Sequence, residues 1–215
     1  DLKRIADRLP VDTAALAKLS GEIAGRPVVI AASTHPGEEV IVAGALRGLP
    51  APPLLILVPR HPERGGEVEA QLTQAGWTTA RRSQGQAIAA GTQAYVADTL
   101  GELGLFYAVA DLVVMGGSLV AGLAGHNPLE PARFGRALIS GPHIASFADI
   151  YAELVLAKGA LIANDPAELA SGLKALLDAP PVAHVLGHNA LAVADQGRDA
   201  FNRAWAALQP LVGAA

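Results

Sequence analysis

The residues best suited to chemistry lie in one stretch of the chain, between positions 112 and 131. An apolar run, 112–115, is followed by Gly116-Gly117-Ser118 and then by Gly125-His126-Asn127-Pro128-Leu129-Glu130-Pro131. We interpret this order as a strand, a glycine-rich loop and a helix over 128–134. Backbone N–H groups left open by the glycines and by the helix start would meet a phosphate, and a carboxylate one turn in would bind a ribose diol. The stretch therefore predicts a nucleotide site.

A purely structural reading exists for part of this stretch. Asn127 is a favourable N-cap residue, and Glu130 stands at the third helical position, where acidic residues stabilise a helix start. Capping does not explain the glycines that precede them, because so many glycines cost conformational entropy unless a close approach or a positive φ requires them. We therefore favour ligand binding for Glu130.

Other polar residues follow the predicted strands in the same way. Ligands of an open parallel sheet bind beyond the carboxyl ends of its strands, so these residues are the candidates for a site. The opposite strand ends are preceded by ordinary turns, which places one polar rim at the carboxyl edge. The residues that follow strands are Ser33, Thr34 and His35 with Pro36-Gly37-Glu38-Glu39, Pro59, Arg60 and His61, Asp98 and Thr99, Gly116-Gly117-Ser118, and Gly141-Pro142-His143.

Arg60 is the strongest single candidate on this rim. A guanidinium at the end of a buried strand faces either an internal carboxylate or an anionic ligand, and its planar geometry suits phosphate. His61 beside it is either a hydrogen-bond donor to the same phosphate or an ordinary loop histidine. The run from His35 to Glu38 is equally consistent with a helix entry whose acidic first turn complements the helix dipole. Glu102 is read as structural, because Thr99-Leu100-Gly101-Glu102 matches a capping box.

Strands and helices alternate through most of the chain, which predicts right-handed βαβ units. The fold class expected is α/β, a doubly wound parallel sheet of Rossmann-like type. Apolar runs of strand length occur at 28–30, 54–58, 95–96, 112–115, 138–139 and 161–162, with a weaker candidate at 77–80. Helical spacing occurs at 40–49, 68–76, 103–110, 128–134, 147–158 and 166–177, the last with Asp165 as N-cap and Pro166 at the first position.

The segments outside this alternation are expected to be helical. Residues 2–9 and 13–23 predict a lead-in broken at Pro10, and 183–211 predicts one or two closing helices with Trp205 as a packing anchor. The expected division is a lead-in over 1–24, a nucleotide-sugar-binding domain over 25–180 and closing helices over 181–215. The chain begins at Asp1, and its single methionine is Met115. We therefore expect a fragment or a processed piece of a longer protein.

Composition excludes several classes of function. The net charge of -4 gives no basic face for nucleic acid, and the absence of cysteine rules out disulfides and thiolate metal sites. No apolar run is long enough to cross a membrane, and no leader opens the chain, so we expect a soluble piece that makes no membrane contact itself. No metal is expected. His184 and His188 have i, i+4 spacing but lack acidic partners, and we interpret them as surface residues.

The polar rim resembles the C-terminal half of the Kdo transferases, GT-B glycosyltransferases that attach 3-deoxy-D-manno-oct-2-ulosonic acid (Kdo) to a lipid A precursor. The similarity spans nearly the whole chain. Its most specific part is Gly116-Gly117-Ser118 together with 125–131, whereas the loop 121–124 between them departs from the Pro- and Ile-rich version expected for the family. The other matching motifs are Ala31-Ala32-Ser33-Thr34-His35-Pro36-Gly37-Glu38-Glu39, Val58-Pro59-Arg60-His61-Pro62-Glu63-Arg64, Ala80-Arg81-Arg82-Ser83, Asp98-Thr99-Leu100-Gly101-Glu102-Leu103 and Gly141-Pro142-His143.

The resemblance implies that this half binds the donor CMP-Kdo. The acceptor site, the catalytic base and the membrane anchor would belong to an N-terminal half, so no catalytic residue is expected in this chain and it should be inactive alone. The complete enzyme would work at the cytoplasmic side of the bacterial inner membrane, with no cofactor. The resemblance implies that Ser33, Thr34, Pro59, Arg60 and His61 lie near phosphate and sugar, that Gly116, Gly117 and Ser118 line the phosphate, and that Asn127 and Glu130 hold the ribose. His35, Gly125 and His126 complete the expected substrate-binding residues.

Two alternatives stay open from sequence. The chain could be the donor half of another GT-B protein, which uses a UDP-sugar, or a relative of the UDP-N-acetylglucosamine 2-epimerases. It could also be a flavodoxin-like binding module without catalysis, which would have no nucleotide affinity and would leave the glycine loops unexplained. Half of an active cleft is not expected to turn over.

Overall fold

A parallel β-sheet forms the centre of the molecule. The computed structural model describes residues 6–212, with side-chain surroundings described through residue 196. The seven strands lie in the order β3-β4-β2-β1-β5-β6-β7, and every pair is parallel. This confirms the doubly wound α/β fold, including its weakest strand, β3. The strands are β1 (Val28–Thr34), β2 (Leu54–Pro59), β3 (Thr79–Arg81), β4 (Ala94–Val96), β5 (Leu112–Met115), β6 (Ala137–Ser140) and β7 (Ala160–Ile162).

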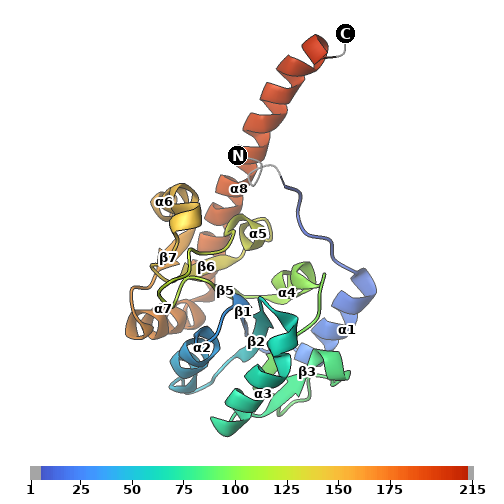
Figure 1. Ribbon diagram of the computed structural model, residues 1–215, viewed down its shortest axis with the longest axis vertical. Coiled ribbons are helices and arrows are strands. Elements are labelled where there is room, and N and C mark those ends of the chain that lie inside the picture. The colour runs from blue at the N-terminus through green and yellow to red at the C-terminus, as the bar shows by residue number, and fades with distance from the viewer. Residues whose placement is uncertain (1–5, 213–215) are drawn as a thin grey trace.

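Helices cover both faces of this sheet (Figure 1). On one face lie α1 (Thr13–Ile23), α4 (Leu103–Val109), α5 (Leu129–Ala132) and α6 (Ala148–Leu156). On the other lie α2 (Glu38–Arg47), α3 (Gly65–Gln74) and α7 (Pro166–Asp178). The long helix α8 (Pro180–Val212) contributes to both layers. Short 3₁₀ turns occupy Pro62–Arg64, Arg82–Gln84 and Ala145–Phe147.

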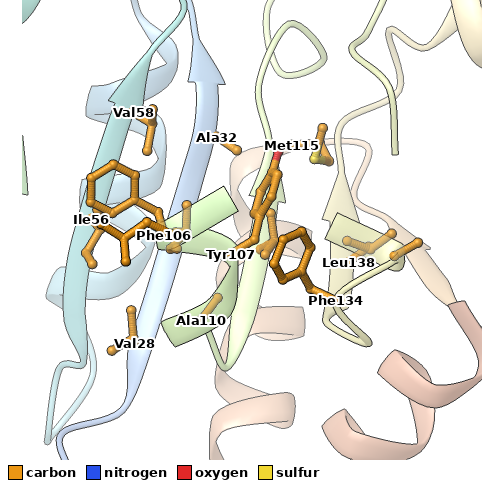
Figure 2. Packing of buried hydrophobic residues seen from close by; sticks show 14 of the residues in the cluster. Val28, Ala32, Ile56, Val58, Phe106, Tyr107, Ala110, Met115, Phe134 and Leu138 are labelled. Atoms are coloured by element: carbon orange, nitrogen blue, oxygen red, sulfur yellow. The ribbon is translucent and has the colours of Figure 1, made fainter. Parts of the chain in front are cut away.

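The strand sequences explain why both faces are covered. Val28, Ile30 and Ala32 of β1 point into one apolar layer, whereas Val29 and Ala31 point into the other. A strand that is apolar at every position must be buried on both sides, which is typical of a parallel sheet. Figure 2 shows the first layer, where Phe106 and Tyr107 of α4 pack over the central strands.

The strand order places a topological switch point between β1 and β5. The chain moves from β1 toward β2 and β4, and later from β5 toward β6 and β7, so the connections diverge at this point. Such a divergence leaves a crevice beyond the carboxyl ends of the two strands. Ser33 lies there with φ of 57°, beside an irregularity in the β1–β2 register. A non-glycine residue in the left-handed region is strained, and such strain is often found at functional sites.

Several expected boundaries are corrected by the structure. The helix expected over 2–9 is wrong for residues 6–9, which are not helical, and residues 1–5 lie outside the described part. The helix expected over 128–134 is the shorter α5, and the tail is a single helix, α8. Trp205 lies outside the residues whose side chains are described. Asp165 caps α7 as expected, because its side chain accepts a hydrogen bond from the Glu168 N–H at 2.8 Å. The division into 1–24, 25–180 and 181–215 stays a prediction.

Candidate functional site

A pocket of about 340 Å³ lies beyond the carboxyl ends of the strands, at the switch point. Its walls come from the end of β1, the turn after β2, the start of α4, the loop that precedes α5, and the segment that precedes α1. The lining residues are Leu9, Pro10, Ser33, Arg60, Gly101, Leu103, Gly104, His126, Asn127, Glu130 and Phe147. The position agrees with the rim expected from the sequence.

Arg60 and Glu130 line this same pocket, although 70 positions separate them in the sequence. The backbone N–H of Arg60 donates to the Thr34 carbonyl at 2.9 Å, which joins the turn after β2 to the end of β1. Its side chain is exposed, and its guanidinium makes no hydrogen bond or ion pair within the described part of the chain. Its charge acts at longer range on His126 and Glu130. An exposed cation and a half-buried carboxylate therefore share one concave surface.

Glu130 sits in an environment that disfavours its charged form. Burial raises the pKa of this carboxyl above its usual value, while the charges of Arg133 and Arg60 and a hydrogen bond with Asn127 act in the opposite direction. The side-chain oxygen of Asn127 also accepts from the Leu129 N–H at 3.1 Å. Asn127 thus holds both the start of α5 and the carboxylate, as a capping residue would.

We expect Glu130→Gln to make the folded chain slightly more stable at pH 8. A raised pKa means that ionising Glu130 costs more in the folded than in the unfolded state, so its charge lowers stability above the folded pKa and this penalty disappears as the pH falls through that pKa. The gain should be on the order of 0.5 kcal/mol, discounted for solvent screening. Thermal unfolding at several pH values measures it. A Glu130→Gln variant that is less stable than the wild type at pH 8 would contradict this account.

The glycine-rich loop after β5 does not offer the open amides expected from the sequence. The N–H of Gly117 donates to Glu38 at 2.7 Å, that of Ser118 at 2.9 Å and that of Leu119 at 2.8 Å. Glu38 also accepts from the His35 N–H at 2.9 Å, and its side chain is fully buried. The expectation that these N–H groups are free for phosphate is therefore wrong. The Leu129 N–H at the start of α5 is likewise taken, by Asn127.

The glycines instead allow backbone segments to approach closely. A side chain at Gly116 would meet the Ser33 carbonyl oxygen at 2.5 Å, which would push β5 from the end of β1. Gly117 has φ of 69° and lies against the His126 ring, where an added carbon would be 2.7 Å from Cδ2. The Gly125 N–H donates to the Gly117 carbonyl at 2.8 Å. The glycine content thus shapes the loop that carries His126 to the pocket.

Histidines from separate loops gather at the pocket edge. The Nε2 atoms of His35 and His126 are 2.9 Å apart, and the two rings stack with centroids 5.1 Å apart. His61 meets His35 edge-on at 6.1 Å, and its side chain is exposed. Burial first, and then electrostatic interaction with His35 and Arg60, lowers the pKa of His126. The Nε2–Nε2 contact uses one ring nitrogen of each histidine, and each ring keeps its Nδ1 for another partner.

Some expected site residues lie inside the fold rather than along the pocket. Thr34 is buried and donates to Glu39 at 2.9 Å, and Glu39 pairs with Arg64 at 2.7 Å. Ser118 is buried, donates to the Met115 carbonyl at 2.6 Å and accepts from the Gly141 N–H at 2.8 Å. These contacts point to structural roles. Of the expected residues, Ser33, Arg60, His126, Asn127 and Glu130 line the pocket, whereas Thr34, His35, Pro59, His61, Gly116, Gly117, Ser118 and Gly125 do not.

Other lining residues were not expected from the sequence. Leu9 and Pro10 come from the lead segment, Gly104 from α4 and Phe147 from the turn before α6. A glycine inside a helical pattern can indicate that another segment packs closely on the helix, and Gly104 is such a glycine. Leu9, Pro10 and Phe147 gave no such signal, because nothing local in the sequence indicates which apolar residues face a pocket.

A larger cavity, about 490 Å³, lies at the opposite edge of the sheet. The two arginines that line it are hydrogen-bonded to backbone carbonyls. Arg26 donates to the Thr92 carbonyl at 2.7 Å, and Arg136 donates to the Tyr107 carbonyl at 2.9 Å. This edge holds the amino ends of the strands, where α/β proteins do not place their ligands. Size alone therefore does not make it the functional site. Among the described residues, no group of three or more His, Asp or Glu side chains is arranged to hold a metal ion.

Several proteins with known names are similar to this chain. The 3-deoxy-D-manno-octulosonic acid transferase of Haemophilus influenzae is 39% identical over 86% of this chain and 44% of its own length. The protein of the same name from Rickettsia bellii is 33% identical over 83% of this chain and 43% of its own length. The chain therefore spans less than half of these relatives. No model of a protein family matches it.

Solved structures agree with these relatives. The C-terminal CMP-Kdo binding domain of WaaA from Acinetobacter baumannii is 36% identical, with a TM-score of 0.77 over 85% of this chain and 98% of that domain. HepE of Anabaena, solved with UDP, is 17% identical with a TM-score of 0.59, which shows a shared fold only. In the described part of the chain, no helix combines the length and apolar character needed to span a bilayer.

Proposed function

Since the chain belongs to the 3-deoxy-D-manno-octulosonic acid transferase family, we propose that it binds the activated sugar donor, CMP-Kdo, as the C-terminal half of a GT-B glycosyltransferase. The observation that carries this proposal is that Arg60 and Glu130 line one pocket at the switch point of the sheet. A nucleoside monophosphate needs a cation for its phosphate and an acceptor for its ribose hydroxyls. The pocket supplies both.

The proposed roles follow from the chemistry of each group. Arg60 neutralises the phosphate through charge-assisted hydrogen bonds, and His126 adds a donor beside it. The Glu130 carboxylate accepts hydrogen bonds from the ribose hydroxyls, and Asn127 holds that carboxylate in place. Ser33, at the strained end of β1, offers its hydroxyl from the pocket wall. The glycine loop places these groups without contributing its own N–H groups of Gly117 and Ser118.

In the proposed reaction, the hydroxyl of a lipid A precursor attacks the anomeric carbon of Kdo. The bond from that carbon to the phosphate oxygen breaks, CMP leaves, and a base in the other half of the enzyme takes the hydroxyl proton. Negative charge grows on the phosphate as CMP leaves, and Arg60 is positioned to stabilise it, by about 3 kcal/mol in comparable sites. We place the complete enzyme at the cytoplasmic face of the inner membrane and propose that it requires no metal ion.

We expect CMP to bind this chain and to shift the NMR amide signals of Gly116, Gly117 and Asn127. The loop that carries these residues borders the pocket, so a ligand there changes their surroundings. Titration with UMP and UDP at the same concentrations tests the alternative donor class, and EDTA tests the metal-free proposal. Unchanged spectra at millimolar CMP would overturn the proposal, as would tighter binding of UDP than of CMP.

The other functions have less support. The solved structures that contain UDP are less than 20% identical to this chain and show only the fold. A non-catalytic flavodoxin-like module would need no arginine and carboxylate in a shared pocket. The named relatives, together with that pocket, favour the Kdo donor.

A further inference from the structure

The segment before α1 contributes to the lining of the pocket. Residues 6–12 are extended rather than helical, and in Figure 1 they form the blue connection that leads into α1. Leu9 and Pro10 of this segment line the pocket, and Leu9 and Val11 also pack against the main apolar layer. The segment is therefore part of the domain's packed structure.

Gly104 is the position on α4 that admits this segment. A side-chain carbon built there would be 2.5 Å from the Pro10 carbonyl oxygen and 2.9 Å from the Leu9 Cβ. Neither distance is compatible with a real contact, and the first involves backbone, which cannot rotate away. Any larger residue at 104 must lift the segment from the helix.

A second contact fixes the same segment on α5's side of the pocket. The Arg8 guanidinium lies 3.9 Å from the centre of the Phe134 ring, a cation–π contact. Phe134 follows α5, the helix that carries Glu130. The segment thus contacts α4 through Leu9 and Pro10, and the residue Phe134 just after α5 through Arg8.

The pocket lining combines polar side chains with uncharged, mostly apolar ones. Arg60, His126, Asn127 and Glu130 supply the polar groups, which suit phosphate and ribose. The other lining residues are Ser33, which carries a hydroxyl, and six without a polar side-chain group: Leu9, Pro10, Gly101, Leu103, Gly104 and Phe147. A nucleobase, whose flat faces are weakly hydrated, is the part of a nucleotide that gains most from such a lining.

We infer that segment 6–12 is a wall of the donor pocket and that Leu9 and Pro10 pack on the nucleobase, an inference that rests on the proposed function. The segment would then contribute base affinity, and Gly104 would be the positioning residue that lets it reach the base. Phosphate and ribose recognition would not depend on it.

The test compares CMP with ribose 5-phosphate, which has the sugar and the phosphate but no base. Leu9→Ala should weaken CMP binding about fivefold, because apolar contact area is lost, and should leave ribose 5-phosphate within about twofold of the wild type. Gly104→Ala should weaken CMP binding by a similar factor. The control is Gly44→Ala on α2, where an added carbon has no atom within 4 Å and CMP binding should not change.

The possible outcomes separate the two proposals. If the wild type binds CMP but Leu9→Ala and Gly104→Ala bind it equally well, the segment is not a wall and the inference fails alone. Equal losses of CMP and of ribose 5-phosphate in Leu9→Ala would also overturn it, since they indicate a general disturbance of the pocket. If the wild type binds no CMP, the proposed function fails and the inference with it. Leu9 is partly exposed, so its variant remains informative if Gly104→Ala does not fold.

Discussion

Replacing Glu38 by Gln should lower the free energy of unfolding of this chain by about 3 kcal/mol, because a buried acceptor of several N–H groups is lost. The carboxylate accepts from His35, Gly117, Ser118 and Leu119, and its side chain is fully buried. A Gln side chain has one acceptor oxygen, and its NH₂ group would face N–H donors. At least one donor would stay buried without a partner.

Thermal unfolding measures this effect. For a chain of this size, we expect the melting temperature to fall by about 6–12 °C. The matched control is Glu63→Gln, which removes the same charge from an exposed side chain and should change stability by less than about 0.5 kcal/mol. If the two variants unfolded at the same temperature, Glu38 would not organise the loop.

Replacing Arg60 by Ala should weaken CMP binding by about 10- to 100-fold, which corresponds to about 1.5–3 kcal/mol for hydrogen bonds to a charged group. Arg60 is exposed at the pocket, so its removal should not change the melting temperature. Calorimetric titration of folded variants with CMP measures the loss. In the complete enzyme, turnover should fall as well, because the proposed role of the same guanidinium is to stabilise the leaving phosphate.

Lys174→Ala is the control for charge alone. Lys174 lies on α7, on the opposite face of the sheet from α4 and α5, and pairs with Asp178. The Lys174→Ala substitution removes one positive charge, as Arg60→Ala does, and should leave CMP affinity unchanged. Equal affinities in the Arg60 and Lys174 variants would show that Arg60 has no direct role. A weaker dependence of CMP affinity on salt in Arg60→Ala would support the assigned contact.

The fold was predictable because its signals are local and repeated. Runs such as 54–58 are apolar at every position, and only a strand covered on both faces buries such a run. The alternation with helical segments then left few topologies open. The predicted helix is wrong over residues 6–9, because the apolar Leu9 packs on α1's layer and against Gly104 rather than on a helical stripe.

The site was predictable in part. Arg60 could be selected because it follows a strand, and carboxyl ends of parallel strands share one edge. Glu130 could be selected because it stands in the first turn of the helix that follows the glycine-rich loop after β5. The role of the Gly116–Ser118 loop could not be selected. Whether its N–H groups are open depends on Glu38, which is 79 positions from Gly117, and no local pattern reports that contact.

The amino-acid sequence by itself determined the sheet, the edge at which polar residues gather and the residue types available there. These features follow from the spacing of apolar residues and from the order of strands and helices along the chain. Both can be recognised from residues that are near one another in sequence. Only the tertiary structure decided that Glu38 occupies the loop amides, that Thr34 and Ser118 face inward, and that Leu9 and Pro10 reach the pocket. These outcomes depend on distances between segments that are remote in sequence, and such distances are set when the helices pack on the sheet.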